Sequence, residues 1–182
     1  MGNYLQLIIS PAYTLEYIPL SVNSPPISGH PVDDCPKGSV IVIKSPSHLP
    51  NAVWGGLTSA RASFLGAQGV VVQGNVRDLM ECQELGFPVF ASGKSTLGAA
   101  GYARVGSVGE ALKLCDDTLW PVLVKTGDLI LGDINGVVCI PIDRVTQVAQ
   151  LCAVLTMADE RCMEDVKAGK SLTQAFKEYR GK

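Results

Sequence analysis

Short apolar runs, rich in β-branched residues, recur through the first half of the chain. They predict buried strands at Gly38–Lys44, Val70–Val72 and Phe87–Phe90. A segment with helical spacing fills each of the two intervals between them; the first opens at the glycine pair Gly55–Gly56 and the second ends at Leu85. The expected apolar face of the first helix consists of Leu57, Ala60, Phe64 and Leu65.

This strand–helix–strand order is typical of a βαβ unit, and ligands in open α/β sheets bind at the carboxyl ends of the strands. The strand around Val70–Val72 ends at Gly74–Asn75, and Arg77 and Asp78 follow it directly, at the start of the second helix. We therefore expect a functional site at Arg77 and Asp78.

The second half of the chain is richer in strand signals and ends in helices. Strands are predicted at Val105–Leu114, Trp120–Val124, Leu129–Leu131 and Val137–Ile140. The first two flank a loop at Asp116–Asp117, and Asn135–Gly136, between the last two, is a strong hairpin signal. Asp143 is expected to cap a helix that runs to about Ala168, and Ser171–Tyr179 predicts a short last helix. The expected apolar face of the longer helix consists of Val145, Val148, Ala149, Cys152 and Leu155.

Six prolines interrupt residues 1–37. Leu7–Ile9 and Tyr13–Leu20 have the composition of strands, but the prolines, Pro11 among them, are expected to divide the region into short pieces. The span Ser21–Lys37 is expected to be an irregular loop. We treat residues 1–37 as irregular.

Composition and charge fit one globular α/β domain over residues 1–182, in which residues 143–182 form the C-terminal helices. The chain is 47% hydrophobic and 18% charged, which is enough apolar material for a substantial core. Its net charge of −2 argues against a nucleic-acid surface. No apolar stretch reaches the roughly 18 residues of a membrane span, and the N-terminus lacks the pattern of a signal peptide. A cytoplasmic location is expected.

Two other kinds of site are not indicated. The six cysteines are scattered without a C-x-x-C pair, with only His30 and His48 as further zinc ligands. The cysteines in apolar segments, which are Cys82, Cys139 and Cys152, are interpreted as small buried side chains. The run Gly93–Thr96 is similar to the end of a phosphate-binding loop, but that motif needs a glycine where this chain has Pro88. A turn is the better interpretation.

A set of motifs in a fixed order resembles one known family. The spacing Gly56-x20-Arg77-Asp78-x2-Glu81 is similar to the signature of the RraA-like family, which includes metal-dependent 4-hydroxy-4-methyl-2-oxoglutarate aldolases and oxaloacetate decarboxylases. The flanking segments agree, and they are Trp54-Gly55-Gly56-Leu57, Gly86–Phe90, Gly127-Asp128 and Asp133-x2-Gly136-Val137-Val138-x-Ile140-Pro141. The resemblance runs from about Ala12 to the C-terminus and is nearest to fungal members.

The resemblance implies a layered β/β/α fold of the swivelling-domain type and a divalent-metal-dependent lyase acting on small 2-oxo acids. Substrate would be bound by Gly55, Gly56, Leu57, Thr58 and Arg77. Asp78 would bind Mg²⁺ or Mn²⁺, with Glu81 holding metal-bound water, and Arg77 and Asp78 would be the catalytic pair. The residue types suit these roles: amides at a helix start attract anions, arginine offers a fixed fork to a carboxylate, and Mg²⁺ binds through few carboxylates.

The same resemblance implies how both reactions share one site. Cleavage of the hydroxy-oxo acid and decarboxylation of oxaloacetate both leave a pyruvate enolate, which a divalent ion would stabilise. The base is not identified by the residues; Asp159 or Glu160, reaching in from a neighbouring subunit, is the candidate that relatives suggest. A homotrimer or a dimer of trimers is expected. Relatives carry a longer helical region at the N-terminus, which this chain lacks or replaces with Met1–Pro11.

Plainer interpretations stand beside each of these. Arg77 and Asp78 could form a surface pair at a helix start, where an aspartate is favoured in any case. Gly55–Gly56 could be an ordinary turn, and Glu81 a solvated helix residue. At the level of function, the alternatives are a non-catalytic member that binds and inhibits a ribonuclease, and an inactive member of the family. Fold alone does not decide among them.

Overall fold

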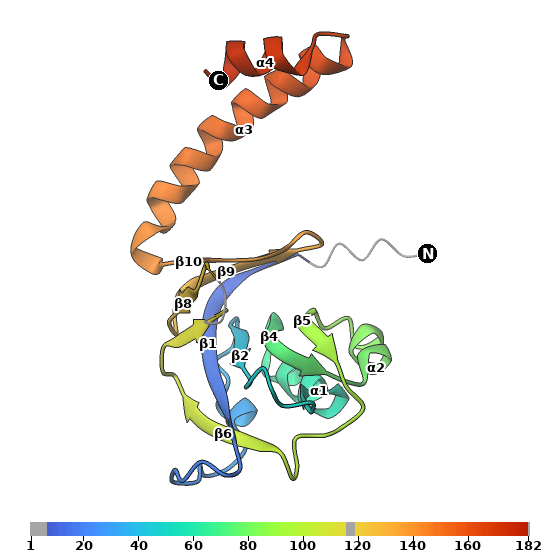
Figure 1. Cartoon of the computed structure of the whole chain (residues 1–182), viewed down its shortest axis with the longest axis vertical. Coiled ribbons are helices and arrows are strands. Elements are labelled where there is room, and N and C mark those ends of the chain that lie inside the picture. The colour runs from blue at the N-terminus through green and yellow to red at the C-terminus, as the bar shows by residue number, and fades with distance from the viewer. Residues whose placement is uncertain (1–6, 116–118, 182) are drawn as a thin grey trace. The chain divides into compact units, whose positions relative to one another are not determined.

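The computed structural model describes residues 7–115 and 119–181 (Figure 1). The loop predicted at Asp116–Asp117 and the first six residues lie outside these ranges. The chain divides into two compact units, residues 1–142 and residues 143–182, and each is described by itself. Within the described residues, no helix is both long and apolar enough to cross a membrane. Whether the two units act as one domain, as the sequence suggested, stays a prediction.

The first unit is built from strands and short helices that include most of the predicted ones, but the predicted strand Val105–Leu114 is divided in two after Val108, and the short strand Ala52–Trp54 was not predicted. Its strands are β1 (Ile8–Pro19), β2 (Val40–Lys44), β3 (Ala52–Trp54), β4 (Gly69–Val76), β5 (Val89–Lys94), β6 (Ala103–Val108), β7 (Leu112–Leu114), β8 (Val122–Val124), β9 (Leu129–Asp133) and β10 (Gly136–Ile140). Its helices are the α-helices α1 (Gly56–Leu65) and α2 (Leu79–Glu84) and the short 3₁₀ helix η1 (Pro31–Asp34); a second 3₁₀ helix, η2 (Ile142–Arg144), leads into the second unit.

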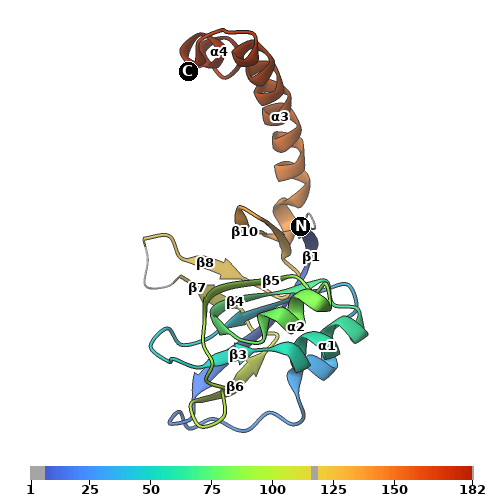
Figure 2. The ribbon, with the colours of Figure 1, turned by 90° about the vertical axis from the view of Figure 1, so that its right-hand side faces the viewer.

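The main sheet has the strand order β10-β9-β1-β2-β4-β3, with β5 also paired to β4 and β6 to β1. Strands β1, β2, β4, β3 and β5 run parallel to their neighbours within this group, whereas β6 and β9 are antiparallel to β1. The carboxyl ends of β3, β4 and β5 therefore meet at one edge of the sheet. Figure 2 shows α1 and α2 lying together on one side of these strands.

The central strands are buried on both faces, which produces three layers. In β2, Ile41 and Ile43 face one core cluster together with Ala62 of α1 and Val32 of η1. Their neighbours Val40 and Val42 face a second cluster that includes Leu112 of β7 and Val124 of β8. Because successive strand residues point to opposite faces, one short strand anchors both the helical layer and the antiparallel β7–β8 ribbon. The predicted α/β fold with β/β/α layers is confirmed.

The N-terminal region is more regular than the sequence suggested. Residues 8–19 form one continuous strand, so the prediction that residues 1–37 are irregular is wrong for this part, and η1 lies within the expected loop. Pro11 is tolerated because the segment around it pairs with β9 alone, through partners such as Leu129, and β2 pairs with β1 only from Ala12 onward. A proline needs no backbone donor on an unpaired edge.

The expected apolar face of α1 is also wrong for three of its four members, Leu57, Ala60 and Phe64. Leu57 and Phe64 are 86% and 81% exposed, whereas Ser59 and Ala62 are fully buried. Small side chains face the sheet because α1 packs closely against it; Leu65 is half-buried against the core, and Leu57 and Phe64 point outward. The exposed large apolar residues of α1 and α2 are Leu57, Phe64, Leu79 and Met80.

The second unit consists of α3 (Val145–Lys167) and α4 (Leu172–Tyr179), which pack through the buried residues Cys162 and Ala175. The N-cap of α3 is Arg144, and Asp143 lies in η2, so the predicted cap is displaced by one residue. The expected apolar face of α3 is exposed or half-buried in the single chain, and Cys152 is exposed rather than buried. Cys82 is buried as predicted, and Cys139 is half-buried. Burial and the nearby Asp128 carboxylate raise the pKa of the Cys139 thiol to about 11.

The layered core can be tested by truncating one residue of β2. Ile41 is fully buried, and Ile41→Ala should lower the free energy of unfolding by about 2–5 kcal/mol, the usual effect of removing a buried branched side chain. Urea denaturation measures this. The matched control is Ile134→Ala, at a position that is 80% exposed in the β9–β10 turn, where a change within about 0.5 kcal/mol is expected. Equal effects at the two positions would contradict the assigned core.

Candidate functional site

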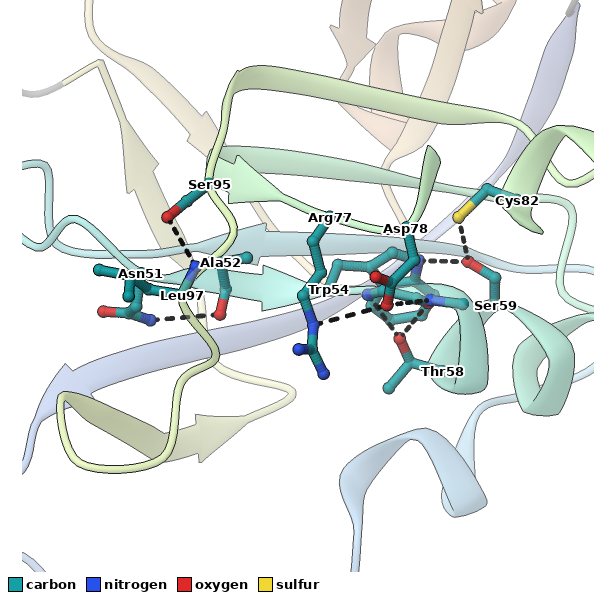
Figure 3. A network of polar contacts seen from close by, with 12 residues as sticks. Asn51, Ala52, Trp54, Thr58, Ser59, Arg77, Asp78, Cys82, Ser95 and Leu97 are labelled. Carbon is teal, nitrogen blue, oxygen red and sulfur yellow. Dashed lines mark hydrogen bonds and ion pairs between the residues drawn. The ribbon is translucent and has the colours of Figure 1, made fainter. Parts of the chain in front are cut away.

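The candidate site lies where the carboxyl ends of β3 and β4 meet the starts of α1 and α2 (Figure 3). Trp54 ends β3 and is followed by Gly55 and Gly56, while Val76 ends β4 and is followed by Arg77 and Asp78. A hydrogen bond of 3.0 Å from the Arg77 amide to the Trp54 carbonyl oxygen ties the two connections together. The parallel pairing of β3 with β4 thus brings segments more than twenty residues apart into one place.

Hydrogen bonds fix the start of α1. The Gly56 amide donates to Oδ2 of Asp78 at 3.1 Å, so the carboxylate from one connection accepts from the helix that begins at the other. The Gly55 amide donates to Oγ1 of Thr58 at 3.0 Å, and the Thr58 hydroxyl donates to the Gly55 carbonyl at 2.8 Å. A carboxylate at this position satisfies an otherwise unpaired amide and lies at the positive end of the helix dipole.

Asp78 has a left-handed backbone conformation, with φ of 56° and ψ of 38°. Aspartate, asparagine and glycine enter this region at the lowest cost among the amino acids. The conformation turns the chain out of β4 and into α2, and it leaves the Asp78 carboxylate beside the guanidinium of Arg77, with Nε and Oδ2 3.5 Å apart. Both side chains are partly exposed, so this ion pair contributes little to stability.

The glycine pair is required by close approach rather than by an unusual backbone angle. A Cβ atom on Gly55 would lie 2.5 Å from Oδ2 of Asp78, and one on Gly56 would lie 1.7 Å from Oε2 of Glu81. Any side chain at these positions would displace a carboxylate. Gly55 and Gly56 therefore form a surface against which the carboxylates of Asp78 and Glu81 both lie.

A buried polar network supports the site from below. The Trp54 indole N–H donates to the Ser59 hydroxyl at 2.7 Å, and the Ser59 hydroxyl lies 3.1 Å from the Cys82 sulfur. All three side chains are buried, and the Trp54 ring stacks on Phe87. The network joins the end of β3 to α1 and α2, and so fixes the spacing between the two helix starts that carry the site.

The structure brings together most of the residues that the sequence proposed. Gly55, Gly56, Thr58, Arg77, Asp78 and Glu81 are connected through the contacts above. The amides of Gly55, the N-cap, and Gly56, the first residue of α1, already donate to the side chains of Thr58 and Asp78. The Leu57 side chain points outward and supplies no contact of its own here.

The proposed base residues are not part of this geometry. Asp159 and Glu160 belong to α3, in the second unit, whose position relative to the first is not described. Within that unit the Asp159 carboxylate accepts from the Arg180 guanidinium, with a closest separation of 2.6 Å. A role from a neighbouring subunit stays a prediction.

Three residues at the end of β5 were missed. A pocket of about 440 Å³ adjoins Arg77 and Asp78, and its lining continues to Lys94, Ser95 and Thr96. The rule that ligands collect at carboxyl ends of parallel strands applied to β5 as it did to β4. These residues had been compared only with the phosphate-loop motif. A larger cavity of about 710 Å³ lies between the main sheet and the β7–β8 ribbon, but mainly apolar side chains line it.

The donor set suits a small hard cation. Asp78 and Glu81 provide carboxylate oxygens, the ligands that Mg²⁺ and Mn²⁺ prefer, and both lie against the same glycine pair. Within residues 7–115 and 119–181, no three histidine, cysteine, aspartate or glutamate side chains form a metal-binding cluster. Two carboxylates fit Mg²⁺, which usually keeps several waters, better than a structural zinc ion, which takes four protein ligands.

Comparison with known proteins identifies the family of this chain. The family model described as RraA-like, Aldolase/RraA, matches residues 3–139, which is most of the chain and contains every residue of the site. The chain belongs to the RraA-like family. The closeness to fungal members stays a prediction.

Two curated relatives are about one-third identical to this chain over the aligned residues. It is 33% identical over 174 residues to Protein DlpA of Legionella pneumophila, covering 94% of this chain and 28% of that protein. It is 33% identical over 127 residues to a putative 4-hydroxy-4-methyl-2-oxoglutarate aldolase of Halalkalibacterium halodurans, covering 70% of this chain and 57% of that protein. The chain thus spans about a quarter to somewhat over half of the curated relatives named here.

Solved structures agree with the RraA-like fold. An uncharacterized protein from Pseudomonas syringae superposes with a TM-score of 0.79 at 24% identity, covering 93% of this chain and 78% of that one. Streptomyces coelicolor RraAS2, described as an unusual member of the RNase ES inhibitor RraA family, gives 0.74 at 21% identity, covering 88% and 77%. At these identities the likeness concerns the fold.

Two substitutions of Asp78 distinguish its role in the fold from any role in chemistry. Asp78→Ala should lower the free energy of unfolding by about 1–3 kcal/mol, because alanine is strained in the left-handed region and leaves the Gly56 amide without its acceptor. Asp78→Asn should stay within about 1 kcal/mol of the wild type, since asparagine tolerates this conformation and keeps an acceptor oxygen. Chemical denaturation measures both. An Asp78→Ala variant as stable as wild type would contradict the importance of this contact.

Proposed function

We propose that the protein is a divalent-metal-dependent lyase that releases pyruvate from 4-hydroxy-4-methyl-2-oxoglutarate-type substrates, decarboxylates oxaloacetate, or does both. The observation that carries the proposal is the convergence of two carboxylates, Asp78 and Glu81, and one guanidinium, Arg77, on the Gly55–Gly56 surface. The membership in the family and the aldolase name of the Halalkalibacterium relative support it.

Asp78 and Glu81 are the residues that would hold Mg²⁺ or Mn²⁺. When bound, such an ion supplies Lewis-acid stabilisation of the negative charge that develops on the ketone oxygen of the substrate. The hydrogen bond from the Gly56 amide restrains the Asp78 carboxylate, so one of its oxygens is fixed before any ligand arrives. A restrained ligand loses less conformational freedom on binding.

Arg77 would bind the 2-oxo acid and stabilise the charge that forms when the carbon–carbon bond breaks. Its backbone is fixed by the bond to Trp54, and its side chain is about half exposed and borders the pocket. A guanidinium offers two parallel donors to a carboxylate or to an enolate oxygen, which an ammonium group does not. Both reactions pass through the enolate of pyruvate, so the same donors serve either substrate.

The proposal predicts a specific pattern of losses. Wild-type protein should form pyruvate, lose this activity with EDTA and regain it with added Mg²⁺ or Mn²⁺. Arg77→Ala should reduce kcat/KM by at least about 10²-fold, the usual cost of removing a donor at a developing oxyanion, and Arg77→Lys should recover little. Asp78→Asn should be folded and inactive, with partial recovery at high metal concentration. A coupled assay for pyruvate measures each variant.

Two controls make this pattern decisive. Arg61→Ala removes a surface arginine of α1 that pairs with Asp33 at 2.6 Å, outside the site, and should keep full activity. Metal without protein corrects for spontaneous decarboxylation of oxaloacetate. Activity that survives thorough chelation, or near-normal turnover by Asp78→Asn, would overturn the metal-dependent mechanism.

We also propose that the protein assembles as a homotrimer or a dimer of trimers. The exposed apolar side chains of α1 and α2 support this, as does a positive mean hydropathy of +0.23. Apolar side chains gathered on one surface of a folded chain are typical of interaction sites. Leu57 and Phe64 are the most exposed of those on α1.

The expected mass in solution is three or six times the chain mass of 19.2 kDa. Light scattering coupled to size-exclusion chromatography at micromolar concentration measures it. A single species at the mass of one chain would contradict the assembly without bearing on the fold.

A further inference from the structure

The pocket beside Arg77 and Asp78 extends beyond the residues that the proposed lyase reaction uses. Its lining joins the β4–α2 connection to the end of β5, through Lys94, Ser95 and Thr96. At about 440 Å³ it falls within the usual size range of small-molecule pockets, about 300–1,000 Å³. A three-carbon 2-oxo acid bound at Arg77 fills only part of this space.

The β4–β5 pairing places Lys94 next to the reacting end of the pocket. In this parallel pair, Val76 is the partner of Lys94, and Val76 is the residue directly before Arg77. The segment after Lys94 is anchored as well: the Ser95 amide donates to the Val76 carbonyl at 3.0 Å, and the Ser95 hydroxyl accepts from the Leu97 amide at 3.2 Å. The backbone position of Lys94 is therefore set by the sheet and by the turn that follows.

The two cationic side chains of the pocket, Arg77 and Lys94, differ in their ion-pair partners. Arg77 has Asp78 as a partner at 3.5 Å, while Lys94 forms no ion pair with the residues that the structure describes. A ligand with a single carboxylate can be bound by Arg77 alone. A second cation in the same pocket, whose lining also includes Thr96, matches a second anionic group on the ligand.

We propose that Lys94 binds the distal carboxylate of a dicarboxylic 2-oxo acid and so determines the preference for dicarboxylic over monocarboxylic substrates. The assignment rests on the proposed function and deepens it, because it names the residue that selects the substrate class. Lys94 is a specificity-determining residue, and it takes no part in breaking the carbon–carbon bond. Since the lysine is exposed, added salt should weaken this preference.

A pair of substrates that differ only at the distal group tests the proposal. 4-Hydroxy-4-methyl-2-oxoglutarate carries a carboxylate where 4-hydroxy-4-methyl-2-oxopentanoate carries a methyl group. Lys94→Gln should reduce kcat/KM for the dicarboxylate about five- to ten-fold, through KM, as expected for a partly solvated charge-assisted contact. The value for the monocarboxylate should change less than about two-fold, because the reacting end is untouched. Lys94→Arg should restore most of the preference, and Lys94→Glu should reverse it.

Two further controls separate specificity from structure. Oxalate resembles only the reacting end of the substrate, so its inhibition constant should be the same for wild type and Lys94→Gln. Lys113→Gln removes an exposed lysine of β7, outside this pocket, and should leave both substrates unaffected. Equal losses for the two substrates, or no loss for either, would overturn the role of Lys94.

The failure of this inference can be told apart from the failure of the proposed function. If wild-type protein cleaves neither substrate, the lyase proposal fails, and calorimetric binding of 2-oxoglutarate and 2-oxopentanoate in the presence of Mg²⁺ then tests Lys94. A preference of wild type for 2-oxoglutarate that Lys94→Gln abolishes supports the assignment without any turnover. Binding with no such preference, or no binding of either acid, overturns it.

Discussion

The hydrogen bond from the Gly56 amide to the Asp78 carboxylate is the contact on which the candidate site depends. It joins the two βα connections of the parallel sheet, one after β3 and one after β4, at the point where both chains leave their strands. Room for the carboxylate exists because no side chain stands on Gly55, where a Cβ would lie 2.5 Å from the same Asp78 oxygen, and the left-handed backbone of Asp78 turns the chain at this point. This one hydrogen bond therefore orders the Asp78 carboxylate and relates the start of α1 to the direction of α2.

Stability and chemistry are divided between the two sides of this contact. On the buried side of the contact, β2 and β4 pack on both faces, which provides burial. The Trp54–Ser59–Cys82 network on the same side fixes distances. On the solvent side of the contact, Arg77 and Asp78 are only partly buried and form a weak ion pair. Charged groups with incomplete partners are costly in a core and useful at an exposed edge, where a ligand can complete them. The sheet edge is the place where both requirements are met.

Much of the fold and most of the site could be predicted from sequence, and the exceptions have physical reasons. Continuous apolar runs of β-branched residues such as Val40–Ile43 identify strands buried on both faces, and the carboxyl-edge rule led to Arg77 and Asp78. The continuity of β1 through Pro11 could not be predicted, because it depends on which of its edges is unpaired. The buried face of α1 was misjudged because close packing selects small side chains, Ser59 and Ala62, over large apolar ones. Lys94 was missed because the carboxyl-edge rule was not applied to β5, and its position beside Val76 is set by strand register, which the rule alone does not give.

The close approach of Glu81 to Gly56 has a consequence for how this protein can vary. With 1.7 Å between a Cβ at position 56 and the Glu81 carboxylate, the two positions share one volume, and a side chain gained at one must be matched by a side chain lost or moved at the other. Substitutions at the pair are therefore expected to be non-additive. Because Glu81 is exposed and its carboxylate is the far end of a flexible side chain, a residue larger than glycine at position 56 would move that carboxylate away and leave the backbone in place. Glycine at position 56 is therefore a condition for the Glu81 carboxylate to lie in the site, and not a condition for the fold.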